Sequence, residues 1–369
     1  MKVLLIGPYP PPHGGISVHV ARVHELLQRY GIACRVLNLD RSAPESDRYI
    51  RVSSSLDFLT VLLGHVRKGW TPHLHTNGHN IKSWLIAFIC GAAGRWRTGA
   101  LLTVHSGMAP AYIAASPAWR RGLLRLSCSL YAHIVCVSSQ IEESIASLGL
   151  GRERLGVLPA FLQIVPPKPV RSANFERWIQ EHKPLLSTTL FFRPEYGFEL
   201  LVKALAQLRR RFPRIGCLVM GIGEQESGAH ALVRRERLED AVLLLGDVTH
   251  ETCLGLMSLS DLFARPTLKD GDSVSVREAI SLGIPVVASS AGTRPPEALI
   301  FEAGNPDDLS AKIESCLKCA RFRPRHNTRV PDPNRQVIDE STSSLLEMYQ
   351  NAALGKVKRV MRRECTWCG

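Results

Sequence analysis

Short apolar runs alternate with longer amphipathic stretches along this sequence, a pattern typical of an α/β protein. The apolar runs are too short for helices and are rich in Val, Ile and Leu, so each predicts a buried strand. The amphipathic stretch 18–30 predicts one of the intervening helices. In the first half of the chain the predicted strands are 3–7, 34–39, 100–105, 134–138 and 155–161.

The alternation stops in a proline-dense segment at 164–169 and then restarts. The second half holds a predicted helix at 199–211 and predicted strands at 185–192, 215–220, 242–245, 262–264 and 286–288. This predicts two doubly wound, parallel-sheet domains. We assign 1–166 to an N-terminal domain, 167–334 to a C-terminal domain, and 335–369 to a C-terminal helix and basic tail. Ligands of such sheets bind beyond the carboxyl ends of strands, so a cleft between the domains is the expected site.

Length and composition agree with this organisation. The 369 residues suffice for two hydrophobic cores, and 45% hydrophobic with 21% charged residues describes an ordinary soluble protein. Met1 leads directly into the first predicted strand without a secretory signal, so we expect a cytoplasmic location. The apolar run 84–94 is much shorter than the roughly 20 residues of a membrane span and predicts a buried helix.

The net charge of +13 is concentrated in the first half, where residues 1–166 hold 17 Lys and Arg against 8 Asp and Glu. Such basicity suits nucleic acid, an anionic membrane or a phosphorylated substrate. Nucleic acid is the least favoured of these, because no helix-turn-helix, zinc-finger or RNP-like motif is present. In segment 116–131, Arg120, Arg121 and Arg125 accompany Trp119, as in an interfacial helix touching the inner membrane face. A surface helix with one buried face is the alternative, and the basic run 356–363 leaves the same choice between lipid contact and a solvated tail.

Ten cysteines are present, and without a secretory signal we expect reduced thiols. Cys316 and Cys319 form one Cys-x-x-Cys pair, and Cys365 and Cys368 form another. The first pair lies within a predicted helix, and neither has the turn residues of a zinc knuckle. We therefore predict no metal ligands, and the role of the C-terminal pair stays open.

Two carboxylates, Asp270 and Glu278, flank a Gly/Ser loop that opens a predicted helix. Ser275 and Glu278 have the spacing of a capping box, and Gly283 followed by Pro285 predicts the helix end. Backbone N–H groups at such a helix start stabilise an anion, for example a phosphate.

The two carboxylates have both a binding and a structural interpretation. Glu278 can accept two hydrogen bonds from a vicinal diol such as ribose, or it can cap its own helix. Asp270 can bind sugar hydroxyls, or it can be an ordinary solvated loop residue. Spacing alone leaves both interpretations open.

Segment 265–289 resembles the acidic-x7-Glu signature of the retaining glycosyltransferases of group 1, family 4. That family commonly shows Glu-Gly-Phe-Gly, a Glu-Ala pair and later Gly-x-Pro-Val-Val-Ala. Asp270 stands at the first acidic position and Glu278 at the second, while Asp272 and Ser273 depart from the commonest pattern and leave the sugar open. The resemblance implies a GT-B fold, a nucleoside diphosphate sugar as donor, and chemistry that needs neither a metal nor a cofactor.

Two loops of the first half extend the resemblance. Gly14 and Gly15 follow the first predicted strand, where the family carries Gly-Gly near the donor's distal phosphate and the acceptor; a simple turn is the alternative. The loop lacks Gly-x-Gly-x-x-Gly, which argues against a nicotinamide dehydrogenase. His105 ends another strand, at the place where the family's histidine contacts the transferred sugar, although a lone histidine is more often structural.

The loop after the strand at 185 departs most from the family. Its usual Arg and Lys, which neutralise the diphosphate, are replaced by Phe191 and Tyr196. Arg193 or Arg265 can substitute, because a diphosphate leaving group needs cationic partners. The departure implies an altered donor or an inactive relative.

Gly221, Gly223 and Gly246 follow strands where the family packs the nucleoside, or else they form strand-exit turns. The resemblance implies catalytic roles for His105, Asp270 and Arg193. The donor-binding set is Gly15, Gly221, Gly223, Arg265, Gly271, Ser273, Val274, Ser275 and Glu278.

The expected function is retaining transfer of a sugar to a glycan or polyprenyl-diphosphate-linked acceptor in cell-surface polysaccharide synthesis, of the exopolysaccharide or lipopolysaccharide type. A sugar-nucleotide epimerase and a non-catalytic nucleotide-sugar binding protein are the alternatives.

Overall fold

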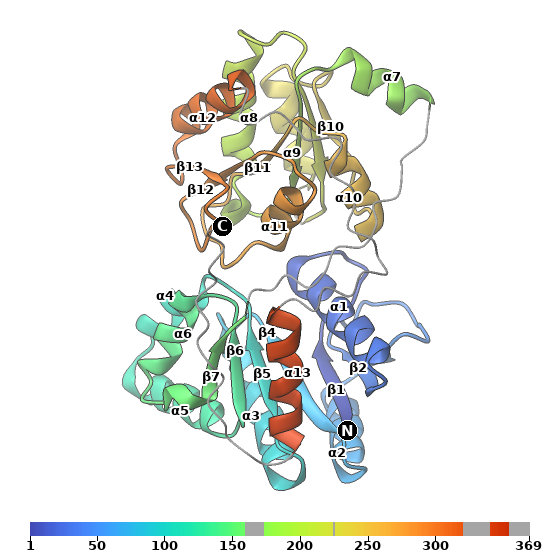
Figure 1. Cartoon of the computed structure of the whole chain (residues 1–369), viewed down its shortest axis with the longest axis vertical. Helices are drawn as coiled ribbons and strands as arrows, with labels where there is room; N and C mark the ends of the chain where they lie inside the picture. The colour runs from blue at the N-terminus through green and yellow to red at the C-terminus, as the bar shows by residue number, and fades with distance from the viewer. Residues whose placement is uncertain (159–172, 224–225, 320–339, 354–369) are drawn as a thin grey trace. The chain divides into compact units, whose positions relative to one another are not determined.

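The computed structural model describes residues 1–158, 173–223, 226–319 and 340–353, which belong to two compact units (Figure 1). The first unit comprises 1–162 together with 337–369, and the second comprises 163–336. The predicted boundaries at 166 and 334 lie outside the described residues and stay predictions. So do the proline-dense segment, the basic run 356–363 and the second Cys-x-x-Cys pair.

The first unit is built on a parallel sheet with the strand order β3-β2-β1-β4-β5-β6-β7. Its strands are β1 Lys2–Gly7, β2 Ala33–Asn38, β3 Ile50–Arg51, β4 Thr71–Thr76, β5 Leu101–Val104, β6 His133–Cys136 and β7 Leu155–Val157. The order reverses between β1 and β4, and ligands of doubly wound sheets bind at the carboxyl ends of strands at such a switch point.

Helices cover this sheet (Figure 1). They are α1 Gly15–Arg29, α2 Ser55–Arg67, α3 Ile81–Arg97, α4 Ala109–Ala114, α5 Ala118–Ser129, α6 Ser139–Ala146 and α13 Glu340–Ala353, with a 3-10 turn at Arg152–Arg154. The predicted buried helix at 84–94 is confirmed within α3, where the Trp84 indole is fully buried and donates to the carbonyl of Gly78 at 2.9 Å.

The C-terminal helix α13 packs on the first unit. Leu345, Met348 and Tyr349 join the core formed by β1 and α1, and the hydroxyl of Tyr349 is hydrogen-bonded to Nδ1 of His73 at 2.5 Å. The chain therefore returns to complete its first unit, a connection that the sequence pattern did not reveal.

The second unit repeats the same topology with the order β10-β9-β8-β11-β12-β13, again all parallel. Its strands are β8 Leu185–Thr189, β9 Gly216–Met220, β10 Val242–Leu244, β11 Leu262–Arg265, β12 Val286–Ser289 and β13 Leu299–Phe301. Its helices are α7 Ala173–Glu181, α8 Phe198–Arg209, α9 Glu226–Arg235, α10 His250–Ser258, α11 Val274–Ser281 and α12 Pro306–Lys318, with a 3-10 turn at Pro194–Tyr196. The switch point of this sheet lies between β8 and β11.

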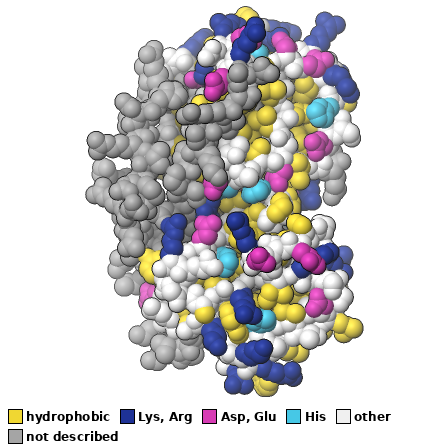
Figure 2. Space-filling view, turned by 90° about the vertical axis from the view of Figure 1, so that its right-hand side faces the viewer, with side chains coloured by type: hydrophobic (Ala, Val, Ile, Leu, Met, Phe, Trp, Pro, Cys, Tyr) yellow, Lys and Arg dark blue, Asp and Glu magenta, His cyan; other side chains and the backbone are white. Residues whose placement is uncertain are grey.

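The surface of the first unit combines basic and apolar side chains. On α5 the Trp119 side chain is 66% exposed and Leu126 is 50% exposed, whereas Leu124 is buried. Figure 2 shows Lys and Arg side chains gathered at the lower end of this unit. Among the described residues, no helix is both long and apolar enough to cross a membrane.

The cysteines of the described segments are free thiols, and Cys90, Cys128, Cys136 and Cys217 are buried as small apolar side chains. Cys316 is buried in α12, and Cys319 is exposed just after that helix. The first Cys-x-x-Cys pair therefore spans the end of α12, so the prediction that both cysteines lie within the helix is wrong for Cys319.

Candidate functional site

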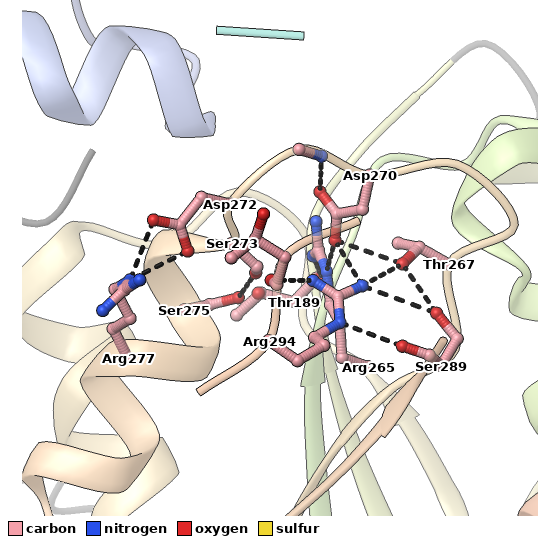
Figure 3. A network of polar contacts seen from close by, with 12 residues as sticks. Thr189, Arg265, Thr267, Asp270, Asp272, Ser273, Ser275, Arg277, Ser289 and Arg294 are labelled. Atoms are coloured by element: carbon pink, nitrogen blue, oxygen red, sulfur yellow. Dashed lines mark hydrogen bonds and ion pairs between the residues drawn. The ribbon is translucent and has the colours of Figure 1, made fainter. Parts of the chain in front are cut away.

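A polar network lies at the carboxyl ends of β8 and β11, the switch point of the second sheet (Figure 3). Arg265 is the last residue of β11, and its Nη1 donates to the carbonyl of Thr189, the last residue of β8, at 2.7 Å. This bond fixes a guanidinium at the sheet edge where doubly wound domains bind their ligands.

Asp270 is the centre of the network. Its side chain is 12% exposed, and its Oδ2 accepts hydrogen bonds from Nε of Arg265 at 3.0 Å, Nη2 of Arg294 at 3.1 Å and Oγ1 of Thr267 at 3.1 Å. Its other oxygen accepts from the backbone N–H of Gly271 at 3.0 Å. The interpretation of Asp270 as a solvated loop residue is therefore wrong.

Charge pairing outweighs burial at Asp270 and Arg265. Burial alone would raise the pKa of Asp270, yet the guanidinium groups of Arg265 and Arg294 hold that pKa below its usual value. Burial likewise opposes the charge of Arg265, but the Asp270 carboxylate raises the pKa of Arg265. The site thus contains a buried carboxylate and a buried guanidinium, both ionised at neutral pH.

Arg294 was not predicted from the sequence. It follows β12, and besides Asp270 it donates to the carbonyl of Ser289 at 3.0 Å and to Oγ1 of Thr267 at 3.1 Å. Burial lowers its pKa, and the Asp270 carboxylate opposes that shift. In the sequence, only its position after a predicted strand indicated that Arg294 could lie at the site, because it belongs to no recognisable motif.

The helix beside this network begins at a different residue from the one predicted. α11 spans Val274–Ser281 with Ser273 as its N-cap residue, so the predicted capping box of Ser275 and Glu278 is wrong. A capping box joins the N-cap to the third helical residue, whereas Glu278 is the fifth. The hydroxyls of Ser273 and Ser275 lie 3.1 Å apart at the helix start (Figure 3).

The predicted end of α11 is confirmed. Gly283 adopts a φ of 73°, and its N–H donates to the carbonyl of Ile280 at 2.9 Å. The N–H of Ile284 donates to the carbonyl of Ala279 at 2.9 Å, which completes a Schellman motif.

Glu278 points away from its own helix start. It is 5% exposed, and its Oε1 is 2.5 Å from Nε2 of His250, the first residue of α10. His250 was missed because it lies 28 residues earlier in the chain.

Asp272 is also buried. Its two carboxylate oxygens accept hydrogen bonds from Nε of Arg277 at 2.8 and 2.9 Å. Burial raises the pKa of Asp272 despite this cationic partner.

Of the two residues that replace the family's Arg and Lys, Tyr196 lies against Arg265 and Phe191 packs on Tyr196. The Arg265 guanidinium lies 5.4 Å from the ring centre of Tyr196, and the Phe191 and Tyr196 rings meet edge to face at 5.6 Å. Arg193 is exposed, with its guanidinium 5.9 Å from the Phe191 ring. Of the two candidate cations, Arg265 is therefore the one held in the network.

Packing explains the glycines of the loop after β9. Gly221 has a φ of 145°, and a Cβ there would lie 1.6 Å from the carbonyl oxygen of Leu190. At Gly223 a Cβ would lie 2.7 Å from the backbone nitrogen of Phe192. Both residues are needed for the fold itself, so a donor-binding role stays a prediction.

Gly15 differs from those glycines. It opens α1, and a Cβ added there would meet no protein atom within 4 Å. The preceding turn is fixed by Ser17, whose Oγ accepts from the N–H of Gly14 at 2.9 Å and donates to the carbonyl of Pro12 at 2.7 Å. The fold does not require glycine at 15, and its predicted contact with a ligand stays a prediction.

Gly15→Ala is therefore expected to lower kcat/KM about tenfold or more while the melting temperature stays within about 2 °C of wild type, because alanine suits the first turn of a helix. Steady-state kinetics and thermal unfolding measure the two effects. Gly122→Ala, in α5, is the matched control, since a Cβ there also meets no atom within 4 Å. Equal kinetics for both variants would contradict the ligand-contact interpretation.

His105 follows β5 in the first unit and lies beside the imidazole rings of His19 and His75. Its Nε2 lies 3.2 Å from Nδ1 of His75 in β4, and the neighbouring Ser106 is hydrogen-bonded to His79 at 2.9 Å. Burial places the pKa of His105 well below its usual value, so the ring is neutral. The predicted position at the carboxyl end of the sheet is confirmed, and its contact with sugar stays a prediction.

Two parallel sheets of the same reversed order, one bearing an acid–guanidinium network at its switch point, define a GT-B architecture. Sequence profiles agree: the profile described as "Glycosyltransferase Family 4" matches residues 13–162, and "Glycosyl transferases group 1" matches residues 174–330. The chain belongs to the group 1, family 4 glycosyltransferases.

Solved structures show the same fold. Sucrose-phosphate synthase from Thermosynechococcus elongatus has a TM-score of 0.70 and 18% identity, covering 96% of this chain and 97% of that one. Anabaena HepE in complex with UDP and glucose has a TM-score of 0.67 and 16% identity, covering 96% and 99%.

Curated relatives match shorter regions. The Schizosaccharomyces pombe phosphatidylinositol N-acetylglucosaminyltransferase gpi3 subunit is 23% identical over 204 residues, 53% of this chain and 43% of that protein. A GDP-mannose-dependent phosphatidylinositol monomannoside mannosyltransferase of Corynebacterium glutamicum is 26% identical over 146 residues, 36% of this chain and 38% of that protein. The match spans less than half the length of these relatives.

Proposed function

We propose that this protein is a retaining glycosyltransferase that moves a sugar from a nucleoside diphosphate sugar to a glycan or lipid-linked acceptor in cell-surface polysaccharide synthesis. One observation carries the proposal: the buried Asp270–Arg265–Arg294 network beside the start of α11, at the switch point of the second sheet. The structure of Anabaena HepE, which has a similar fold and was solved in complex with UDP and glucose, supports it.

The network suits departure of a diphosphate. Arg265 and the amides at the start of α11, near Ser273 and Ser275, present positive charge where the leaving group gains negative charge, and positioned charge of this kind lowers the barrier. Asp270 binds the sugar hydroxyls and Glu278 the ribose, while His105 of the first unit contacts the sugar. These roles involve neither a metal nor a cofactor.

A panel of UDP-, GDP- and ADP-sugars tests donor binding. We expect one donor to raise the melting temperature of wild type by mass action, and Glu278→Gln to abolish that increase because the ribose loses its charged acceptor. Glu297→Gln, an exposed change in the loop after β12, is the control and should behave as wild type.

The alternatives give different products. An epimerase would interconvert donor sugars without an acceptor, and a binding protein would release no diphosphate over long incubation. Retention is tested by NMR of the anomeric proton of the product. If no donor stabilises the folded wild type, the proposal fails.

The acceptor is proposed to carry phosphate and to reside at an anionic membrane. The surplus of basic residues in the first unit and the exposed Trp119 and Leu126 of α5 support this, as do relatives named for phosphatidylinositol substrates. A peripheral position on the inner membrane face follows.

Wild type should therefore bind phosphatidylglycerol vesicles, and the bound fraction should fall with rising salt, because exposed charges are screened. The double variant Trp119→Ser with Arg121→Gln should bind these vesicles severalfold more weakly in a sedimentation assay. Arg177→Gln, on the exposed face of α7, is the control. Salt-insensitive or absent binding would contradict membrane contact.

A further inference from the structure

Three histidines of the first unit bring their imidazoles together. His19 of α1, His75 of β4 and His105 after β5 each offer one ring nitrogen, and these three nitrogens lie within 4.8 Å of one another. All three side chains are buried. We call this set the histidine cluster.

The topology explains the convergence. β1 and β4 are neighbours at the switch point, β5 is the next strand, and α1 follows β1 directly. His75 lies near the carboxyl end of β4 and His105 just beyond β5, so both rings reach the same sheet edge. Residues separated by 56 and 30 positions therefore share one small volume.

The distances within the cluster suit a metal ion. Nδ1 of His75 and Nε2 of His105 are 3.2 Å apart. Two imidazole nitrogens on one tetrahedral zinc ion, each about 2.0–2.1 Å from the metal, are roughly 3.4 Å apart. The ring nitrogen of His19 lies within 4.8 Å of these two nitrogens.

The hydrogen bonds of the neighbouring histidines distinguish the cluster from His73. Nε2 of His75 is buried and has no hydrogen-bond partner. The adjacent His73 is different, because its Nδ1 is bonded to the Tyr349 hydroxyl and its Nε2 to Oγ1 of Thr103 at 2.8 Å. His73 is thus satisfied by protein groups and stands outside the cluster, whose imidazole nitrogens are of the ligand type that late first-row metals prefer.

We propose that His19, His75 and His105 bind a late first-row transition-metal ion, with Zn²⁺ as the best-suited ion and one position left for water. On the proposed function, in which His105 contacts the donor sugar, bound Zn²⁺ occupies that histidine and inhibits transfer. The metal site itself does not depend on that function, since ligand set and distances alone define it.

Direct binding tests the site on the full chain. Apo protein, freed of metal with EDTA and held under reducing conditions, is titrated with Co²⁺ and with Zn²⁺ against a chromophoric chelator. We expect one equivalent with the visible bands of tetrahedral Co²⁺ and no thiolate-to-cobalt charge-transfer band, because the ligands are imidazoles. The latter band would identify binding by cysteines instead.

His19→Gln should weaken this equivalent more than about 100-fold, since even outer partners of metal ligands contribute 10–100-fold. His24→Gln, on the same helix and hydrogen-bonded to Gln28, is the matched control and should bind as wild type. The titration of wild type does not depend on any variant. If wild type binds no equivalent of Co²⁺ through imidazoles, the proposal is overturned, even if His19→Gln misfolds. Equal affinity in folded His19→Gln also overturns it.

Inhibition separates the two proposals. If transferase activity is present, Zn²⁺ should inhibit wild type and His24→Gln more strongly than His19→Gln. Zinc binding without any transferase activity would refute the proposed function and leave the metal site intact. Transferase activity without zinc binding would refute the metal site and leave the proposed function intact.

Discussion

Arg265→Gln is expected to lower turnover about 10²–10³-fold, because the diphosphate loses a positioned charge in a water-poor site. The same change should lower the free energy of unfolding of the second unit by about 3–5 kcal/mol, since it removes one partner of a buried ion pair. Asp270 then keeps Arg294 as its single guanidinium partner, and the carbonyl of Thr189 loses its donor. Single-turnover kinetics and urea unfolding measure the two effects.

Two variants make this result specific. Arg193→Gln, at an exposed guanidinium over Phe191, should have a much smaller effect on both quantities. Arg265→Lys keeps the positive charge, but lysine lacks the planar guanidinium that donates to both Asp270 and Thr189. We therefore expect losses of turnover and stability smaller than those of Arg265→Gln. If Arg193→Gln is the more damaging change, Arg193 is the diphosphate partner and the assignment of Arg265 is wrong.

The periodic pattern predicted most of the fold because the strands of parallel sheets are continuously apolar. β1, β6, β9 and β12 are confirmed within two residues of their predicted ends. β4 was missed, although it lies beside β1 and is buried along its whole length. Its sequence, Thr71-Pro-His-Leu-His-Thr76, holds a proline and two histidines, so its burial depends on tertiary partners that no local pattern reveals.

Spacing along the chain predicted the candidate site only where its residues are close in sequence. Asp270 and Glu278 belong to one loop and helix, and a motif could identify them. Their partners Arg294 and His250 come from other elements. These hydrogen bonds join residues 24 and 28 positions apart, and no local sequence pattern predicts a contact at that separation. The predicted capping box was wrong for a related reason. The carboxylate of Glu278 is hydrogen-bonded to His250 and does not cap the N-terminus of α11.

The histidine cluster shows the same limit in a stronger form. His105 was selected as a single residue at a strand end, and the neighbours that define its chemistry, His19 and His75, lie on other elements. An alternating His-x-His in an unrecognised strand was the available signal. Recognising it required the register of β4 against β5, in which His75 pairs with Thr103.

Mild acid is expected to destabilise the first unit strongly. His73 and His75 are fully buried and His105 is only partly exposed, and burial lowers the pKa of each, that of His73 to about 3. In the unfolded chain each titrates near its ordinary pKa of about 6.5, so below that pH the unfolded state binds more protons than the folded state. Stability is therefore complete above about pH 7 and is lost as the pH falls through 6.5 toward the folded pKa.

Each histidine contributes about 1.4 kcal/mol over the whole window from pH 7.5 to 5.5, which is centred near the unfolded pKa, so the three together should remove about 4 kcal/mol. Urea unfolding at several pH values, with EDTA to exclude bound metal, measures the slope. His73→Gln takes away one titrating ring and should reduce the pH slope by about a third, whatever its effect on absolute stability. A free energy of unfolding that stays constant from pH 7.5 to 5.5 would contradict burial of neutral imidazoles, because three protons taken up on unfolding cannot leave stability unchanged.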